Sequence, residues 1–378
     1  MAGSSFGTLF RITTWGESHG KGIGVVVDGC PAGLSLNEED IQLFLDRRKP
    51  GQNKYTTQRQ EADAVEILSG VFEGRTTGTP ISLMVFNKDQ RSKDYSDIAS
   101  YYRPGHADYG FDQKYGFRDY RGGGRSSGRE TIGRVAAGAI ASKLLGELGI
   151  QVTAYTKSIG MVECDPAHFD RSRILNSKLY MPDEEAEERA LLFLDECIEK
   201  QTSSGGMVEC LVEHMKPGIG EPVFDKLDAC LGKALFSIGA VKAVEIGDGL
   251  AVSRSMGHEN NDQFTELSPA PADASQTESG TRRAQKAANH AGGILGGISD
   301  GSNILIRAAF KPTPSISRAQ TALFQDGTCH EIRIKGRHDP IIVPRAVVVV
   351  EAMTAITILD LLLWNMTATL DKLHRIYD

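Results

Sequence analysis

Paired cysteines, metal-binding histidine motifs and nucleotide-binding glycine loops are all missing from this sequence. Its six cysteines are scattered and no Cys-x-x-Cys occurs, which excludes a zinc knuckle or a redox pair of that type. No His-Glu-x-x-His occurs, no Gly-Lys-Ser/Thr completes a P-loop, and no G-x-G-x-x-G follows the first predicted strand. We therefore expect no metal site and neither type of nucleotide-binding domain.

Residues 1–20 contain no basic segment followed by an apolar run, so no secretory signal is expected. Without such a signal, the cysteines are expected to be reduced and mostly buried, and the protein to be cytoplasmic. The apolar stretch 345–366 is long enough to span a membrane, but Glu351 and Asp360 lie inside it. A bilayer tolerates such charges poorly, so we expect a buried core helix and no membrane partner.

An excess of basic residues is also absent. The chain has 42 Lys and Arg against 49 Asp and Glu, a formal net charge of −7. Nucleic-acid-binding domains usually present a strongly basic face, so nucleic acid is not expected as the main partner. The 378 residues, 40% hydrophobic and 24% charged, have an ordinary globular composition.

The hydrophobic pattern alternates between strand and helix periodicities, which indicates an α+β or α/β fold. Strands are predicted at residues 24–28, 80–86, 207–214 and 303–310. Helices are predicted at residues 37–48 (capped by Asn37), 128–148, 183–200, 224–236 and from 345 onward. No repeat and no long linker is present, so a single domain is predicted, with mobile surface loops near 45–60, 182–188 and 268–281.

The most informative segment is Arg121-Gly-Gly-Gly-Arg125-Ser126-Ser127-Gly128-Arg129-Glu130-Thr131. Ser127 and Glu130 have the spacing of a capping box, so the glycine loop is predicted to lead directly into a helix N-terminus. Free amide hydrogens, the helix dipole and the two later arginines would attract phosphate there. The alternatives are an RGG-like RNA-binding segment and a plain capped helix. The segment occurs once and precedes a well-patterned helix, which favours anion binding.

Two further segments suit an anion. A basic cluster at residues 47–59 is as typical of a solvated face as of a loop that folds over an anion. A glycine loop at residues 291–301 precedes the predicted strand 303–310, and Lys311-Pro312-Thr313-Pro314-Ser315 follows that strand. A lysine and hydroxyls on a proline-stiffened loop suit a phosphate-bearing cofactor, although alone the segment would be interpreted as a tight turn.

Three of the nine histidines lie in glycine- or proline-bearing loops with charged neighbours: His19, His106 and His338. Histidine titrates near neutrality and can pass a proton to a leaving phosphate oxygen. A single histidine is more often structural, so each of the three is only a candidate on its own.

Taken together, these segments resemble the chorismate synthase family. The resemblance rests on the following motifs, which occur in the family's order: Trp15-Gly-Glu-Ser-His-Gly20, Leu45-Asp-Arg-Arg-Lys-Pro-Gly51, Tyr55-Thr-Thr-Gln-Arg59, Leu68-Ser-Gly-Val-Phe-Glu-Gly74, Arg103-Pro-Gly-His-Ala-Asp-Tyr109, Asp119-Tyr-Arg-Gly-Gly-Gly-Arg-Ser-Ser127, Val244-Glu-Ile-Gly247, Ala291-Gly-Gly-Ile-Leu-Gly-Gly297 and Gly336-Arg-His-Asp-Pro340. Any one of them could arise by chance, whereas the ordered set is specific.

The resemblance implies an α+β fold, a β-α-β sandwich in one large domain, assembled as a homotetramer. It implies a carbon–oxygen lyase of the shikimate pathway of aromatic amino acid biosynthesis. The substrate 5-enolpyruvylshikimate 3-phosphate would lose phosphate and a ring hydrogen in a 1,4-anti elimination that gives chorismate. Reduced FMN would be required without net redox change, because the departing hydrogen is not acidic and the cofactor carries the difficult step. NADPH is a possible reductant, and the compact chain favours an external supply of reduced flavin.

The resemblance also implies roles for individual residues. His106 would protonate the leaving phosphate, His19 would set the protonation of the flavin, and Asp339 would take a proton near its N5. Ser18 and Ser127 would act as relays. Substrate would be held by Arg48, Lys54, Arg103, Arg129 and Arg337. Flavin would be contacted by Arg125, Ser126, Ser127, Gly239, Ala240, Gly296, Lys311, Pro312, Thr313, Pro314, Ser315 and Arg337.

Four positions depart from the family's usual residues: Lys54 in place of Arg, Gly128 in place of Ala, Pro314 in place of Ser and Ile341 in place of Cys. Lysine keeps the charge but loses the forked geometry of arginine. Two other functions remain as alternatives, a metal-independent phosphatase or phosphotransferase acting on a small anion and an RNA-binding protein that uses the Arg/Gly loop. The acidic total and the lack of aromatic-rich basic stretches count against RNA.

Overall fold

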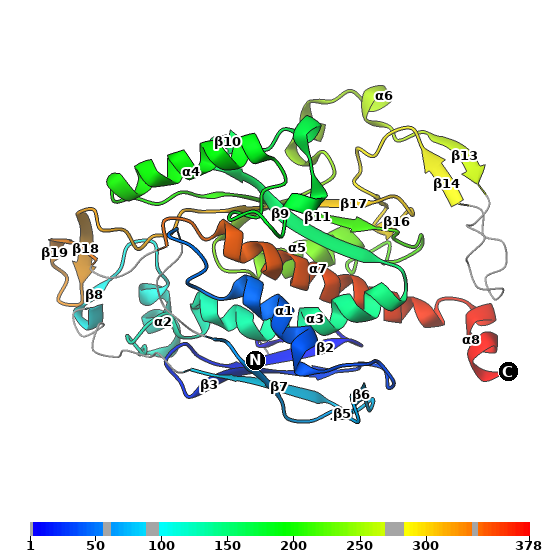
Figure 1. The fold of residues 1–378 in the computed structure, drawn as a ribbon, viewed down its shortest axis with the longest axis horizontal. Helices are drawn as coiled ribbons and strands as arrows, with labels where there is room; N and C mark the ends of the chain where they lie inside the picture. Colours follow the sequence, from blue (N-terminus) through cyan, green and yellow to red (C-terminus); the bar gives the residue numbers. More distant parts are fainter. Residues whose placement is uncertain (1–2, 56–61, 88–97, 269–282, 335–338) are drawn as a thin grey trace.

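The chain forms two antiparallel sheets with a layer of helices between them, in a computed structural model that describes residues 3–55, 62–87, 98–268, 283–334 and 339–378 (Figure 1). The first sheet has the order β1-β2-β3-β7-β4, with bounds Ser5–Phe6, Arg11–Gly16, Gly22–Asp28, Ile81–Phe86 and Val65–Ile67. The second has the order β10-β9-β11-β17-β12, with bounds Val162–Glu163, Gln151–Ile159, Gly206–Glu213, Ile304–Phe310 and Val241–Ile246. The four predicted strands correspond to β3, β7, β11 and β17.

The middle layer consists of α1 (Glu38–Arg48), α3 (Thr131–Glu147), α5 (Leu227–Phe236) and α7 (Val343–Trp364). Helix α3 contacts β3 and α7, and α7 contacts β9 and β11, so the helices connect the two sheets. One continuous hydrophobic core includes both sheets and these helices. The predicted α+β fold, a β-α-β sandwich in a single domain, is confirmed.

Residue alternation explains which sheet face is buried. Side chains of β17 alternate strictly between buried and half-buried, and those of β7 do the same up to Val85. Successive strand side chains point to opposite faces, so every second residue of these strands faces the helices. The outer side of the second sheet is partly covered by α4 (Glu184–Glu199), which contacts β10 (Figure 1).

Helix α7 is the predicted core helix. It is long and apolar enough to cross a membrane, but 89% of its most apolar 18-residue stretch is buried inside the protein. Its two acids have partners: Glu351 accepts both Nη atoms of Arg47 at 2.7 and 2.9 Å, and Asp360 accepts the amides of Thr8, Leu9 and Phe10. Gly138 of α3 lies against α7 so closely that a Cβ would stand 2.2 Å from Ala352 Cβ. The two helices therefore require glycine at this crossing.

Smaller elements complete the chain. Near the N-terminal ends of α3 and α7 lie α2 (Asp108–Tyr115) and the sheet β19-β18-β8, with bounds Cys329–Ile332, Gln320–Phe324 and Tyr101–Tyr102 (Figure 1). The opposite end carries α6 (Gly257–Asn260), α8 (Leu370–Tyr377) and the hairpin β13–β14 (Phe264–Ser268 and Arg283–Lys286). Two further hairpins are β5–β6 (Val71–Phe72 and Arg75–Thr76) and β15–β16 (Ile294–Leu295 and Ile298–Ser299).

Several local expectations need correction. Residues 182–188, expected as a mobile surface loop, form the start of α4, because the side chain of buried Asp183 caps the helix by accepting Ala186 N at 3.1 Å. Residues 45–48, expected at the edge of another loop, end α1, and Leu45 and Arg48 are buried there. Helix α5 begins at Leu227 rather than Phe224, whose positive φ of 51° breaks the helical backbone. The third expected loop, near 268–281, lies outside the described residues apart from Ser268.

All six cysteines are free thiols, and Cys30, Cys164, Cys197 and Cys210 are buried. Burial raises the pKa of Cys30 to about 11 and that of Cys164 to about 12. These thiols are therefore protonated and unreactive at neutral pH.

Candidate functional site

The connection between β2 and β3, residues 17–21, carries Ser18 and His19. Ser18 is buried, and its Oγ is hydrogen-bonded to His19 Nδ1 at 3.0 Å. Gly122 of the Arg/Gly loop lies against the imidazole, since a Cβ at this glycine would stand 2.6 Å from both Cε1 and Nδ1 of His19. Its φ of 140° also favours glycine. The Arg/Gly loop thus closes over His19 only because Gly122 has no side chain.

The Arg/Gly loop is tied to β2 by Arg125. Its Nη1 donates to the carbonyl of Gly16 at 3.1 Å, and its Nη2 donates to the carbonyl and the hydroxyl of Thr14 at 3.1 and 2.5 Å. Ser126 Oγ donates to the carbonyl of Gly123 at 2.7 Å. The guanidinium of Arg125 therefore holds the loop in place, and its predicted contact with flavin stays a prediction.

The expected capping box at Ser127 is not formed. Ser127 Oγ accepts the amide of Arg129 at 3.3 Å and caps the short 3-10 turn Gly128–Glu130, which precedes α3. The carboxylate of Glu130 does not reach back to Ser127. It accepts hydrogen bonds from Thr14 Oγ1 at 2.9 Å and from Arg134 Nε at 2.8 Å. The glycine loop still leads into a helix N-terminus, as the sequence predicted.

A buried carboxylate joins two of the predicted substrate residues. Asp63 Oδ2 lies 2.5 Å from Arg48 Nη2, and Asp63 Oδ1 lies 3.2 Å from Arg129 Nη1. The side chains of Arg48 and Asp63 are 1% and 0% exposed. Burial lowers the pKa of Arg48 to about 10 despite the opposing charge of Asp63, with Arg345 and Arg129 lowering it further. Arg48 remains cationic at neutral pH.

Asp339 is held beside this cluster by Arg345, in the first turn of α7. Arg345 Nη1 donates to Asp339 Oδ2 at 2.9 Å, and Arg345 Nε donates to the carbonyl of Arg48 at 3.2 Å. Asp339 is therefore positioned next to the predicted anion-binding arginines. Arg337 and His338, which precede it, lie outside the described residues, as does Arg59 in the basic cluster.

The turn that carries His106 packs against the loop that follows β17. His106 Nε2 and Ser315 Oγ are hydrogen-bonded at 2.8 Å, and Lys311 Nζ donates to the carbonyl of Gly105 at 2.8 Å. The hydroxyl oxygen of Thr313, in the same loop, is buried and has no hydrogen-bond partner in the described part of the chain. Two predicted segments that are distant in sequence are therefore in contact.

Short contacts connect the His106 turn to Asp339. Ser203 Oγ donates to the carbonyl of Thr313 at 2.7 Å, and the amide of the next residue, Ser204, donates to the carbonyl of Pro340 at 2.9 Å. Gly239 and Ala240 join the same region, because the amide of Lys311 donates to the carbonyl of Ala240 at 2.9 Å. At the other end of the cluster, Asn87 accepts Arg129 and donates to the carbonyls of Glu17 and Gly20, which flank His19. A continuous series of contacts therefore runs from His106 through Asp339 and Arg129 to the His19 connection.

Three predicted residues, Lys54, Gly296 and Arg103, have partners or positions that the sequence did not predict. Lys54 Nζ pairs with Asp195 of α4 at 2.8 Å, and its side chain is 64% exposed. Gly296, in the turn between β15 and β16, lies beyond the start of β17, whereas Lys311 follows its end, roughly 20 Å of strand away. Arg103 contacts the His106 turn, but Asp108 binds it with Nε–Oδ2 and Nη2–Oδ1 distances of 2.8 and 2.7 Å. The predicted substrate contact of Lys54 and the predicted flavin contact of Gly296 therefore stay predictions.

The structure adds polar residues that sequence reasoning missed: Asp63, Asn87, Asp108 and Arg345. Asp108 and Arg345 lie within the quoted motifs or close to one, while Asp63 and Asn87 lie between motifs and have no local pattern of their own. Burial would raise the pKa of Asp108, but hydrogen bonds and the charge of Arg103 outweigh it and lower that pKa. These residues hold predicted site residues in place.

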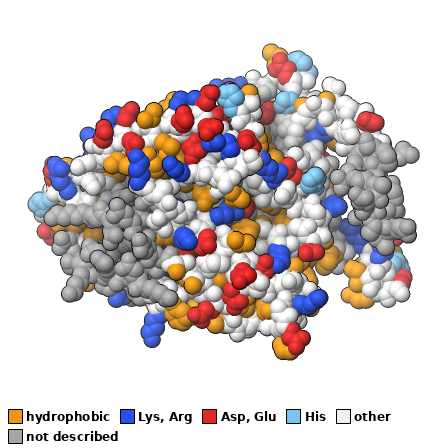
Figure 2. Space-filling model, in the orientation of Figure 1, with side chains coloured by type: hydrophobic (Ala, Val, Ile, Leu, Met, Phe, Trp, Pro, Cys, Tyr) orange, Lys and Arg blue, Asp and Glu red, His pale blue; other side chains and the backbone are white. Residues whose placement is uncertain are grey.

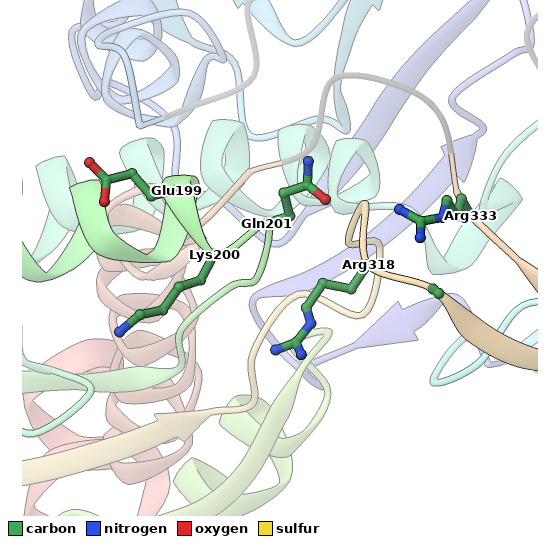
Figure 3. A pocket seen from close by; sticks show the side chains of 6 residues that line it. Glu199, Lys200, Gln201, Arg318 and Arg333 are labelled. Atoms are coloured by element: carbon green, nitrogen blue, oxygen red, sulfur yellow. The ribbon is translucent and has the colours of Figure 1, made fainter.

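A solvent-open hollow of about 480 Å³ lies next to this region (Figure 3). It is lined by the end of α4 and by Arg318 and Arg333, which follow Ser315 and precede Asp339 in the chain. Lys200 contributes a third cation and Glu199 a carboxylate. On the face drawn in Figure 2, by contrast, basic and acidic side chains are interspersed over the described residues. The side chains that line the hollow are exposed, so solvent can screen their charges.

Comparison with known proteins gives one consistent family. The family model described as chorismate synthase matches residues 10–363. A chorismate synthase of Lachnoclostridium phytofermentans is 63% identical over 377 residues, covering 100% of both chains, and one of Agathobacter rectalis is 61% identical, covering 100% of this chain and 99% of the relative. A crystal structure of a chorismate synthase superposes with a TM-score of 0.73 at 31% identity, covering 98% of this chain and 96% of the other.

Proposed function

The chain belongs to the chorismate synthase family, and we propose that the residues connected from His106 to His19 form its active site. The enzyme is a lyase of the shikimate pathway that eliminates phosphate from 5-enolpyruvylshikimate 3-phosphate to give chorismate. The family uses reduced FMN without net redox change. The supporting observation is a series of hydrogen bonds and ion pairs that links four groups: Ser18–His19, Arg48–Arg129, Asp339 and His106–Ser315.

The cationic part of the site is proposed to hold the substrate. Arg48 and Arg129 share one carboxylate, so the pair retains a net positive charge, and Arg345 stands beside them. Bidentate arginine groups match phosphate and carboxylate geometry, and their attraction is stronger in a buried site than in water. The substrate carries one phosphate and two carboxylates, which suits this cluster. Arg103, Arg337 and Lys54 are proposed to complete it.

The loop after β17 fits the phosphate-bearing part of the flavin. Lys311 supplies a cation, Ser315 a hydroxyl, and Thr313 a buried hydroxyl whose hydrogen-bonding capacity is unused within the described residues. A Cβ added at Gly239 would meet nothing within 4 Å, so a ligand can approach the backbone there. We propose that Lys311–Ser315, Gly239, Ala240 and Ser126–Ser127 hold FMN. Gly296 would contribute only from a different part of the assembly.

His106, His19 and Asp339 are the residues proposed to transfer protons. His106, held by Ser315, is proposed to protonate the departing phosphate oxygen, because its Nε2 already makes a hydrogen bond to a hydroxyl at 2.8 Å. His19, oriented by Ser18 and Gly122, is proposed to set the protonation of the flavin, and Asp339 to accept a proton. When bound, reduced FMN supplies the electron density that loosens the carbon–oxygen bond. The protein's own residues hold the proton donors and the acceptor in place.

We further propose a cytoplasmic homotetramer supplied with reduced flavin from outside, with NADPH as the possible primary reductant. Large apolar side chains are exposed around α6 and β13, including Leu250, Met256, Phe264 and Leu267. Exposed apolar clusters often mark interfaces. Sedimentation equilibrium measures the assembly, and NADPH oxidation by the pure protein with FMN measures any intrinsic reductase activity.

An anaerobic assay tests the function. Phosphate release from 5-enolpyruvylshikimate 3-phosphate is expected with reduced FMN and not with oxidised FMN or with no flavin. Release that is independent of reduced flavin would support the phosphatase alternative. Tight RNA binding without turnover would support the RNA-binding alternative.

A further inference from the structure

Asn87 bridges two halves of the proposed site. It follows the last residue of β7, beside the start of β3. Its Nδ2 donates to the carbonyls of Glu17 and Gly20, both at 2.9 Å. Those two carbonyls flank Ser18 and His19, so Asn87 holds this connection from both ends.

The other atom of the same amide holds Arg129. Asn87 Oδ1 accepts Nε of Arg129 at 3.1 Å and Nη2 at 2.8 Å. Arg129 Nη1 is directed to Asp63, so all three nitrogens of its guanidinium have fixed partners. The amide of Asn87 has two donor hydrogens and one acceptor oxygen. It therefore bonds the carbonyls of the His19 connection and the guanidinium of Arg129 at the same time.

No other amino acid offers this combination at the same length. Aspartate keeps the acceptor for Arg129 but places a second carboxylate oxygen against the carbonyls of Glu17 and Gly20. Alanine removes both sets of bonds. The backbone of Asn87 is also fixed, since its amide donates to the carbonyl of Lys21 at 3.1 Å. The side chain therefore sets the distance between the His19 connection and the Arg129 guanidinium.

We propose that Asn87 is a positioning residue that keeps the proton-handling His19 connection in register with the anion-binding Arg129. The proposal rests on the proposed function, which assigns those two roles. Misplacing a reacting group by about 1 Å can cost on the order of 100-fold in rate. Loss of the amide should therefore lower turnover without removing any group that touches substrate.

Two substitutions separate the two sets of contacts, those of Nδ2 with residues 17 and 20 and those of Oδ1 with Arg129. Asn87→Asp keeps the contact with Arg129 and loses the contacts with residues 17 and 20, so kcat should fall about 10- to 100-fold while KM for the substrate stays within about threefold. Asn87→Ala loses both sets of contacts. Its kcat should fall similarly, and its KM should rise as well because Arg129 is no longer held. A merely structural role would lower thermal stability in both variants without this split between kcat and KM.

Asn289→Asp is the matched control. Asn289 Nδ2 also donates to a carbonyl, that of Asn303 at 2.8 Å, and its Oδ1 also accepts a cation, Lys286 Nζ at 3.3 Å. It lies near the start of β17, away from the residues proposed as catalytic. Its kcat and KM are expected to match those of the unchanged protein.

A second measurement is independent of activity. Hydrogen exchange followed by mass spectrometry should show faster exchange of the peptide that spans residues 17–21 in both Asn87 variants and not in Asn289→Asp. Unchanged exchange, or faster exchange with unchanged kcat, would overturn the positioning role. An equal rise of KM in both Asn87 variants would also overturn it. If the unchanged protein fails to turn over with reduced FMN, the proposed function fails, and with it this role for Asn87, whatever the exchange data show.

Discussion

Replacing Asp63 with asparagine should destabilise the protein more than any surface carboxylate change. Asp63 has a positive φ of 46°, and asparagine tolerates this backbone as well as aspartate does, so the substitution isolates the charge. It leaves Arg48, whose side chain is 1% exposed, without its counter-ion and weakens the contact with Arg129. Breaking a buried ion pair by removing one partner costs about 3–5 kcal/mol.

The expected shift in melting temperature follows from the chain length. With about 2.1 cal/mol/K per residue, the unfolding entropy of 378 residues is about 0.8 kcal/mol/K. A loss of about 3–5 kcal/mol then lowers Tm by about 4–6 °C. Differential scanning calorimetry of the unliganded protein measures this shift.

Asp28→Asn is the matched control. Its partner Arg11 lies 3.1 Å away and the two side chains are 46% and 53% exposed, so the pair should contribute about 0.2–1 kcal/mol and about 1 °C or less. If Asp63→Asn shifts Tm no more than Asp28→Asn does, the buried carboxylate does not hold the arginine pair together, and the reasoning is refuted.

Three further predictions concern single residues. His106→Ala should fold normally and lose about 10²- to 10⁴-fold in kcat, since it removes one positioned proton donor; near-normal turnover would remove His106 from the mechanism. Gly122→Ala should lower kcat while Gly146→Ala, which meets nothing within 4 Å, should not, because only the first Cβ collides with His19; equal activities would show that the Arg/Gly loop does not close over the imidazole. The pKa of Asp108 is lowered in the folded state, so its stabilisation is present above about pH 4 and is lost as the pH falls below that value. Asp108→Asn should therefore be less stable than the unchanged protein at neutral pH, with the difference shrinking in acid, and a constant difference across pH would contradict this.

Much of the architecture could be predicted from periodicity. The strands at β3, β7, β11 and β17 and the buried helix α7 follow from alternation and from an apolar run whose two acids need partners. Asn37 forms the predicted cap of α1, with Asp40 completing a capping box. These strands, the buried helix and the cap depend mainly on residues close together in the chain, so the sequence of one segment is enough to predict each of them.

The starts of α3 and α5 were predicted three residues too early, whereas α4 begins within one residue of the predicted helix 183–200. Tertiary contacts compete with local ones at such ends. Glu130 has the right spacing to complete a capping box with Ser127, but it contacts Thr14 and Arg134 instead. Asp183 caps α4 through Ala186 and also accepts the amide of Asp165 at 2.9 Å, a contact outside the helix. Neither outcome can be deduced from the segment alone.

The candidate site shows the same division. The histidine and Arg/Gly motifs pointed to His19 and His106, which are hydrogen-bonded to Ser18 and Ser315 in the structure. Asp63 and Asn87 could not be found in this way, because each acts on residues from other parts of the chain, such as Arg48 and Arg129. The family resemblance assigned both Gly296 and Lys311 to the flavin, and β17 lies between them in the chain as the predicted strand 303–310 implies.

A crystal structure of the protein with FMN and 5-enolpyruvylshikimate 3-phosphate would test the central claim most directly. The account predicts both ligands in contact with the Ser18–His19 connection, the His106–Ser315 pair and Asp339, with the substrate's anionic groups on Arg48 and Arg129. Ligands bound at a place where none of His19, His106 and Asp339 contacts them would contradict it.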